Sequence, residues 1–189
     1  MLTKLEEISL ITRCVATDDR HAFERLVEEH APGVRNFLYR LTMGDAALTD
    51  DLSQETFLKA WIGLRSFRAV ARFKTWLFSI AYNEFVSYSR KTREMRLPDD
   101  IQISDSSGGQ PYEPDARATE MRHDIEVAMR NLSETERMLI VLFYMNDLPI
   151  KEISRITGLP QGTVKSYLSR AKTKMANELQ RDCRSSSAY

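Results

Sequence analysis

Side chains that can hydrogen-bond to DNA are concentrated near the end of the chain, between residues 161 and 174. The cations and short polar groups in this stretch can contact base edges and the flanking phosphates. Gly162 and Thr163, at the expected start of a helix, can offer a backbone N–H or a hydroxyl to a phosphate. The candidate duplex-binding residues are Gln161, Gly162, Thr163, Lys165, Ser166, Ser169, Arg170 and Lys174.

The spacing of apolar residues explains why these polar groups share a face. Four apolar residues recur at helical spacing and are expected to pack inward: Val164, Leu168, Ala171 and Met175. A short helix marked by Ile153 and Ile156 comes before them, and Gly158 lies where a tight turn needs a flexible backbone. Residues 147–175 therefore predict a helix-turn-helix whose second helix lies in the major groove of DNA.

The alternative is an ordinary helical hairpin whose outer face is merely solvated. The charge distribution favours the DNA-binding interpretation over this alternative. The whole chain balances 27 Lys and Arg against 27 Asp and Glu, yet no acid occurs between Lys165 and Asn177. Bases also cluster at residues 65–74 and 90–96, whereas residues 97–119 carry five acids against the single base Arg117. The acids cancel the net charge and leave the basic surfaces in place.

The domain organisation follows from an interruption of the helical pattern. Residues 104–114 read SDSSGGQPYEP, which cannot hold a helix or contribute to a core. No alternating β pattern occurs, and a chain that is 42% hydrophobic and 29% charged is typical of a soluble, mostly helical protein. We expect an all-α fold with helical domains at 1–96 and 119–180, a flexible acidic linker at 97–118 and a frayed tail at 181–189.

Three long helices are expected in the first domain, and a capping box in the second. Residues 23–41 have helical periodicity, with Asp18 or Asp19 as the cap. A second run begins near Thr49. The third, residues 73–93, is expected to turn Phe73, Trp76, Leu77, Ile80, Ala81 and Val86 toward the core. Ser133 and Glu136 form a capping box that starts a later helix.

Several classes of protein are excluded. Cys14 and Cys183 lie near opposite ends of the chain without a CxxC partner, and the three histidines are scattered, so we expect reduced thiols, no metal site and no cofactor. No nucleophile, base and orienting residue can be assembled, which argues against an enzyme. Residues 1–17 lack the apolar core of a signal peptide, and no run is long enough to span a bilayer, so a cytoplasmic location without membrane insertion is expected.

Four motifs, in this order, resemble the extracytoplasmic-function sigma factors of the sigma-70 family: DDLSQETFLKAW, FKTWLFSIAYNEF, LSETERMLIVLFYMNDLPIKEISRITGLP and GTVKSYLSRAKTKM. The resemblance covers residues 10–179. It implies that domain 1–96 is a sigma region 2-like bundle that binds core RNA polymerase and opens the promoter minus-10 element. It also implies that domain 119–180 is a region 4-like reader of the minus-35 element, and that the linker threads near the nascent RNA.

The resemblance assigns residues in the first domain. Asp51, Gln54 and Glu55 match the polymerase-binding helix, which accounts for an acidic face that also presents the apolar Leu58. Taken alone, these residues are better explained as an ordinary solvated acidic face. Their position within the motif reverses that preference. Asn83 matches the asparagine of the family's IAxN motif, beside the pocket for a flipped minus-10 base, and an amide can read a base edge.

The same region, residues 65–93, interleaves bases with aromatic residues, a pattern suited to single-stranded DNA. Lys74 and Tyr82 join Asn83 as minus-10 candidates, whereas Phe73, Trp76 and Ile80 are expected in the core. Two positions depart from the family's pattern. The loop 68–72 reads RAVAR where the family has glycine and a small polar residue, and Tyr167 replaces a frequent arginine.

The function implied is that of a sigma factor, which catalyses nothing itself and directs promoter-specific initiation by core RNA polymerase. Its partners would be core polymerase, promoter DNA and an anti-sigma factor. The alternative is a two-domain helix-turn-helix regulator that acts without being a polymerase subunit. This second possibility leaves the DDLSQE face and Asn83 unexplained.

Overall fold

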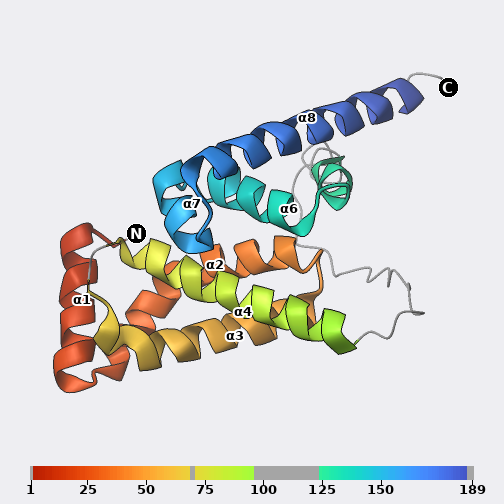
Figure 1. Cartoon of the computed structure of the whole chain (residues 1–189). Helices are drawn as coiled ribbons and strands as arrows, with labels where there is room; N and C mark the ends of the chain where they lie inside the picture. Colours follow the sequence, from red (N-terminus) through yellow and green to blue (C-terminus); the bar gives the residue numbers. More distant parts are fainter. Residues whose placement is uncertain (1, 69–70, 96–123, 187–189) are drawn as a thin grey trace. The chain divides into compact units, whose positions relative to one another are not determined.

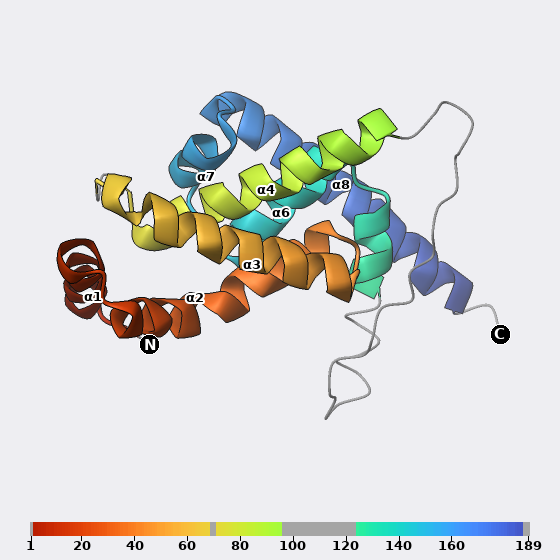
Figure 2. The same ribbon diagram turned by 90° about the horizontal axis from the view of Figure 1, so that it is seen from below.

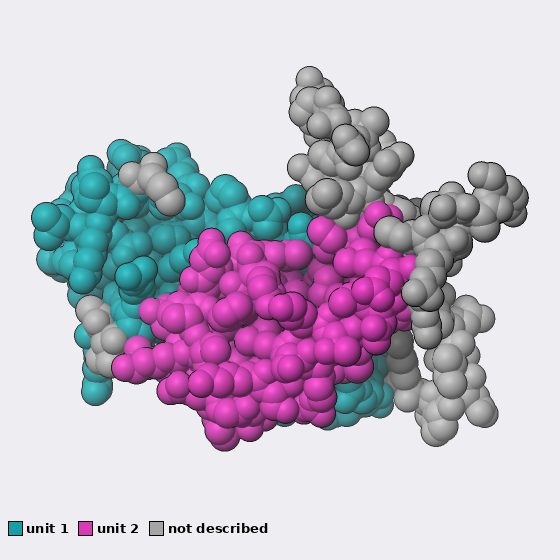
Figure 3. All heavy atoms as spheres, turned by 90° about the horizontal axis from the view of Figure 1, so that it is seen from above, with its two compact units in different colours: residues 1–107 teal, residues 108–189 magenta. Residues whose placement is uncertain are grey.

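The computed structural model describes residues 2–68, 71–95 and 124–186, and their side chains as far as residue 180. Every regular element in these ranges is helical, so the expected all-α fold is confirmed. The chain divides into two compact units, Met1–Ser107 and Gly108–Tyr189, coloured separately in Figure 3. The expected linker 97–118, and residues 119–123 at the expected start of the second domain, lie outside the described residues.

Unit 1 begins with a helix that we did not anticipate, α1 (Lys4–Thr17). Thr3 and Glu6 form a capping box at its start, and the helix ends at Asp18. Ile11 and Cys14 are buried. Burial raises the pKa of the Cys14 thiol, as expected for a thiol removed from water.

Two of the three expected long helices begin at aspartate caps. The α2 helix (Arg20–Leu41) starts where the carboxylate of Asp19 accepts the Ala22 N–H, as expected. The α3 helix (Ala46–Gly63) begins earlier than expected, because Asp45 caps the Leu48 N–H at 3.0 Å. A single 3-10 turn, η1 (Leu64–Ser66), follows α3.

The buried face of α4 (Phe73–Met95) differs from the expectation. Phe73, Leu77 and Ala81 are buried as expected, but three expected core residues are only half-buried: Trp76, Ile80 and Val86. Phe78 and Phe85 are buried instead. The reason is that α4 packs against both α2 and α3, as Figures 1 and 2 show, so its buried arc is wider than one stripe. Phe78 meets Phe37 of α2 with ring centres 5.2 Å apart.

Unit 2 places four helical segments around one core. Residues 124–130 are helical. The α6 helix (Glu134–Ile140) starts at the expected capping box and continues into one π-helical turn, η2 (Val141–Met145). The α7 (Ile150–Thr157) and α8 (Gln161–Ser186) helices complete the unit. The backbone of α8 thus reaches into the segment 181–189 that we expected to fray.

Within the described ranges, no helix combines the length and the apolar composition needed to cross a bilayer.

Candidate nucleic-acid interface

The turn between α7 and α8 has the geometry that its sequence predicts. Gly158 has φ = 71°, in the left-handed region, and its N–H donates to the Ser154 carbonyl at 3.0 Å. A residue with a Cβ would be strained at this angle, so glycine permits the tight turn. Ser154 Oγ also donates to the Leu159 carbonyl at 2.6 Å. The prediction of a helix-turn-helix is confirmed.

The inward face of the second helix is also confirmed. Val164, Leu168 and Ala171 are buried and Met175 is half-buried. Around the rest of the helix the structure exposes most of the candidate duplex-binding residues to solvent, spread over a wide arc in which Gln161 and Arg170 lie about 180° apart. The exposed residues are Gln161, Gly162, Lys165, Ser166, Ser169 and Arg170, and Thr163 is half-buried.

Lys174 is placed differently from these residues. Its Nζ donates to Glu136 Oε2 at 2.8 Å, and this carboxylate also accepts the N–H and Oγ of Ser133 at 3.0 Å each. Burial would raise the pKa of Glu136, but the bonds from Lys174 and Ser133 outweigh it and leave the pKa below its ordinary value. Lys174 therefore ties α8 to the start of α6, and a DNA contact by this residue stays a prediction.

The outer face of α3 presents the candidate polymerase-binding residues. Asp51, Gln54 and Leu58 are exposed and Glu55 is half-buried. Ile62, one turn beyond Leu58, is 70% exposed, more than the 53% of Leu58 itself. Sequence analysis missed Ile62, although its i+4 spacing from Leu58 placed it on the same face. The face is thus acidic near the start of α3 and apolar near its end.

The minus-10 candidates do not share one face of α4. Asn83 is exposed, while Lys74 and Tyr82 are half-buried. At about 100° per residue, Tyr82 lies within about 80° of Lys74, but Asn83 lies about 180° from it. The Lys74 ammonium lies over the Phe78 ring, 5.8 Å from its centre.

Asn83 shares its face with other residues at helical spacing. Ser87 and Arg90, four and seven residues further on, are both exposed. Trp76 and Ile80, which we expected in the core, are half-buried two turns and one turn before it, respectively. The face therefore combines an aromatic ring, an amide, a hydroxyl and a cation. Ser87 was not predicted from the sequence, and Arg90 was noted only as one of the bases at 90–96. The signal for both was their i+4 and i+7 spacing from Asn83.

An ion pair fixes α3 and α4 together beside this face. Lys59 Nζ lies 2.6 Å from the mostly buried carboxylate of Glu84 and 3.5 Å from Glu55. The pKa of Lys59 is raised, mainly by its hydrogen bond to Glu84 and to a lesser extent by Glu55. The pair links α3, which carries the candidate polymerase-binding residues, to α4, which carries Asn83.

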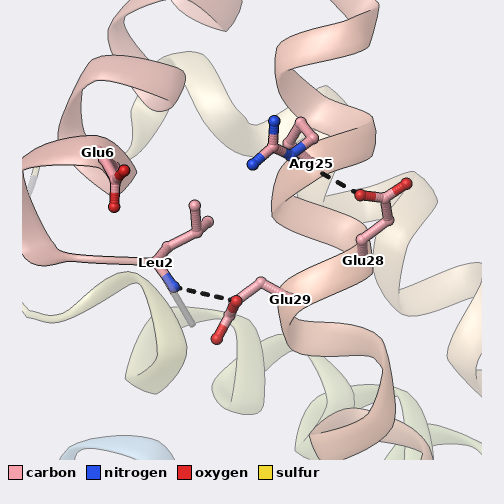
Figure 4. A pocket seen from close by; sticks show the side chains of 5 residues that line it. All are labelled: Leu2, Glu6, Arg25, Glu28 and Glu29. Carbon is pink, nitrogen blue, oxygen red and sulfur yellow. Dashed lines mark hydrogen bonds and ion pairs between the residues drawn. The ribbon is translucent and has the colours of Figure 1, made fainter.

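A pocket of about 250 Å³ lies apart from these surfaces, between the start of α1 and α2 (Figure 4). It is lined by Leu2, Glu6, Arg25, Glu28 and Glu29, and Glu29 accepts the Leu2 N–H at 3.1 Å. None of the candidate residues lines it. Across the described residues, no three His, Cys, Asp or Glu side chains are grouped so as to hold a metal ion.

Comparison with known proteins identifies both units. Sigma-70 region 2 matches residues 26–94, and sigma-70 region 4 matches residues 122–175. The ECF RNA polymerase sigma factor SigM of Bacillus subtilis is 31% identical over 153 residues, covering 80% of this chain and 91% of that protein. The RNA polymerase sigma-H factor of Pseudomonas aeruginosa is 30% identical over 190 residues, covering 95% and 97%.

Solved structures give the same result. The sigma factor RpoE from Bartonella quintana, solved in complex with the anti-sigma factor NepR, is 30% identical and matches with a TM-score of 0.71 over 84% of this chain and 96% of that one. CnrH, solved with the cytosolic domain of CnrY, has the same fold at 23% identity, with a TM-score of 0.66 over 94% and 99%. The chain therefore belongs to the sigma-70 family, among its extracytoplasmic-function RNA polymerase sigma factors.

Proposed function

We propose that this sigma factor binds core RNA polymerase through the outer face of α3, opens the promoter minus-10 element along α4, and reads the minus-35 element with α8. One observation carries this division of labour. Each unit matches a different sigma region and presents an exposed face of suitable chemistry at the matching helix. Unit 1 thus supplies the region 2 activities and unit 2 the region 4 activity.

The polymerase-binding face is proposed to comprise Asp51, Gln54, Glu55, Leu58 and Ile62. Its partner surface would carry bases opposite the carboxylates and an apolar pocket opposite Leu58 and Ile62. Leu58 and Ile62 are both exposed one turn apart and form a small contiguous apolar patch, which supports an interface at this point.

The proposed minus-10 surface centres on Asn83. Its amide can donate to and accept from the edge of an unstacked base. Ser87 and Arg90 can contact the phosphates of the same strand, and the half-buried Trp76 offers part of a ring for stacking. Lys74 and Tyr82, on another side of α4, remain candidate contacts for a separate part of the strand.

The proposed minus-35 surface is the exposed face of α8, with Gln161, Ser166, Ser169 and Arg170 toward the base edges. Lys165 contributes a phosphate contact, and Gly162 and Thr163 a backbone or hydroxyl contact near the helix start.

The protein's own activity, its location in the cell and its regulatory partner complete the proposal. The protein catalyses no reaction of its own, acts in the cytoplasm, and is held inactive by an anti-sigma factor, a kind of partner present in the structure of the Bartonella quintana relative. The rival interpretation, a regulator independent of polymerase, gains no support from the comparisons. A regulator that acts without polymerase would need neither a sigma-70 region 2 nor an α3 face that is both acidic and apolar.

Two substitutions test the division of labour. Lys165→Ala should lower promoter binding by the holoenzyme several-fold and leave binding to core polymerase unchanged, since it removes a phosphate contact. Leu58→Asp should instead weaken binding to core polymerase, because it places a charge in the proposed polymerase interface, and promoter binding by the holoenzyme should fall as a consequence. Co-purification with core polymerase and filter binding of promoter DNA measure the two effects. Loss of core binding in Lys165→Ala would contradict the assignment.

A further inference from the structure

A cation and an aromatic ring are stacked on the DNA-facing side of α8. The guanidinium carbon of Arg170 lies 4.6 Å from the centre of the Tyr167 ring. The two residues are three apart on one helix, so their side chains meet on the same side. Tyr167 is half-buried and Arg170 is exposed. The better anchored ring therefore determines where the freer cation points.

Stacking leaves the hydrogen-bonding edge of Arg170 unused. The five N–H donors of a guanidinium lie in its plane, and a cation held over a ring gives up none of them to a hydrogen-bond acceptor. Lys174, one turn further along the helix, instead donates to Glu136. Among the residues that the structure describes, no carboxylate forms an ion pair with Arg170. Arg170 is thus oriented by a contact that does not compete with DNA for its donors.

An oriented guanidinium and a free ammonium suit different targets. A planar fork held in one direction matches two acceptors in one plane, and a guanine presents O6 and N7 in this way in the major groove. Lys165, exposed on the same helix, is a compact charge on a flexible stem and suits a phosphate oxygen. The neutral ring of Tyr167 adds no charge, so its effect should be on direction rather than on electrostatic attraction.

We propose that Tyr167 is a positioning residue that holds Arg170 in the orientation needed to read one guanine of the minus-35 element. This inference rests on the proposed function and names a specificity determinant within it. Tyr167 departs from the arginine frequent at this position in the resembling family. A tyrosine here gives up the phosphate contact that an arginine could make, and instead orients Arg170 toward its base.

The test uses holoenzyme reconstituted from the full chain and core polymerase. Wild-type holoenzyme first selects a promoter from fragments of its source genome, and each minus-35 base pair is then replaced in turn. Tyr167→Leu should weaken binding to the selected promoter about two- to fivefold, the range of an exposed cation–π contact. It should also reduce discrimination at one G·C pair. Tyr167→Phe should behave as wild type, because the ring face is kept.

Two controls separate positioning from other effects. Lys165→Ala should weaken binding to all sequences equally and lower the slope of affinity against salt by about one, whereas Tyr167→Leu should leave that slope unchanged. In the Arg170→Ala background, Tyr167→Leu should have no further effect, because Tyr167 acts through Arg170. Thermal unfolding of each variant, followed by circular dichroism, should match the wild type.

Three results would overturn the inference: undiminished discrimination in Tyr167→Leu, an equal loss at every base pair, or additive losses in the double variant. A wild-type holoenzyme that selects no promoter would overturn the proposed function as well. The two failures are therefore distinguishable by the wild-type measurement alone.

Discussion

Replacing Lys174 should destabilise unit 2 without touching unit 1. Lys174→Met keeps the aliphatic stem but removes the ammonium that lies 2.8 Å from Glu136. The Glu136 side chain is only 5% exposed, so its charge would remain buried with Ser133 as a donor. A hydrogen bond to a charged group contributes about 1.5–3 kcal/mol. Because Lys174 is 49% exposed, solvent screening reduces the expected loss to about 1–2 kcal/mol.

Urea unfolding can measure this loss in each unit. Both tryptophans, Trp61 and Trp76, lie in unit 1, so tryptophan fluorescence follows that unit alone. Far-UV circular dichroism follows the helices of both units. With a slope of about 1 kcal/mol per molar urea for a unit of this size, the midpoint of unit 2 should fall by about 1–2 M. The fluorescence midpoint should not move. Lys165→Met, exposed on the same helix, should change neither.

The same substitution predicts a dependence on pH. The pKa of Glu136 is lower in the folded protein than its ordinary value. A depressed carboxyl pKa stabilises the fold above the unfolded pKa, about 4.3 for glutamate, and this stability is lost as the pH falls through the folded value. The difference between wild type and Lys174→Met should therefore be full at pH 7 and shrink below about pH 4. Equal midpoints at pH 7, or a difference unchanged in acid, would refute this account of the ion pair.

Three further predictions concern unit 1. Asn83→Ala should lower the permanganate reactivity of minus-10 thymines about tenfold, with core binding intact, because a base-edge contact is lost; full reactivity would remove Asn83 from the minus-10 surface. Ile62→Asp should weaken core polymerase binding about tenfold or more in a competition assay, and an unchanged affinity would place Ile62 outside the interface. Arg65→Gln removes an ion pair to Asp18 whose side chains are 68% and 65% exposed, so the unfolding free energy by tryptophan fluorescence should change by less than about 1 kcal/mol. A larger loss would show that this pair fastens α1 more strongly than solvent exposure allows.

The helix-turn-helix was predictable because its signals are local. The inward periodicity of Val164, Leu168 and Ala171, and the glycine at the turn, each depend on residues a few positions apart. Both capping signals that we used, at Asp19 and at Ser133, are also formed within three residues. Such patterns are encoded in the sequence whatever the tertiary packing.

Some of the errors arose where tertiary packing decides which side chains are buried, and others where a local signal was overlooked. The predicted buried face of α4 was partly wrong, because two neighbouring helices, rather than one, determine which of its residues are buried. Trp76 and Ile80 moved from the core to the edge of the Asn83 face for this reason. The bond from Lys174 to Glu136 spans 38 positions, so no local pattern revealed it. The α1 helix was missed although Thr3 and Glu6 carry a capping-box signal.

Run-off transcription tests the central claim most directly. Purified core RNA polymerase would be incubated with this chain and with fragments of its source genome, and the transcripts would be mapped. The account predicts discrete start sites that appear only with the chain present, that share upstream minus-35 and minus-10 elements, and that disappear with Leu58→Asp. Transcripts that are unchanged by the chain would contradict its role as a promoter-specific subunit of polymerase.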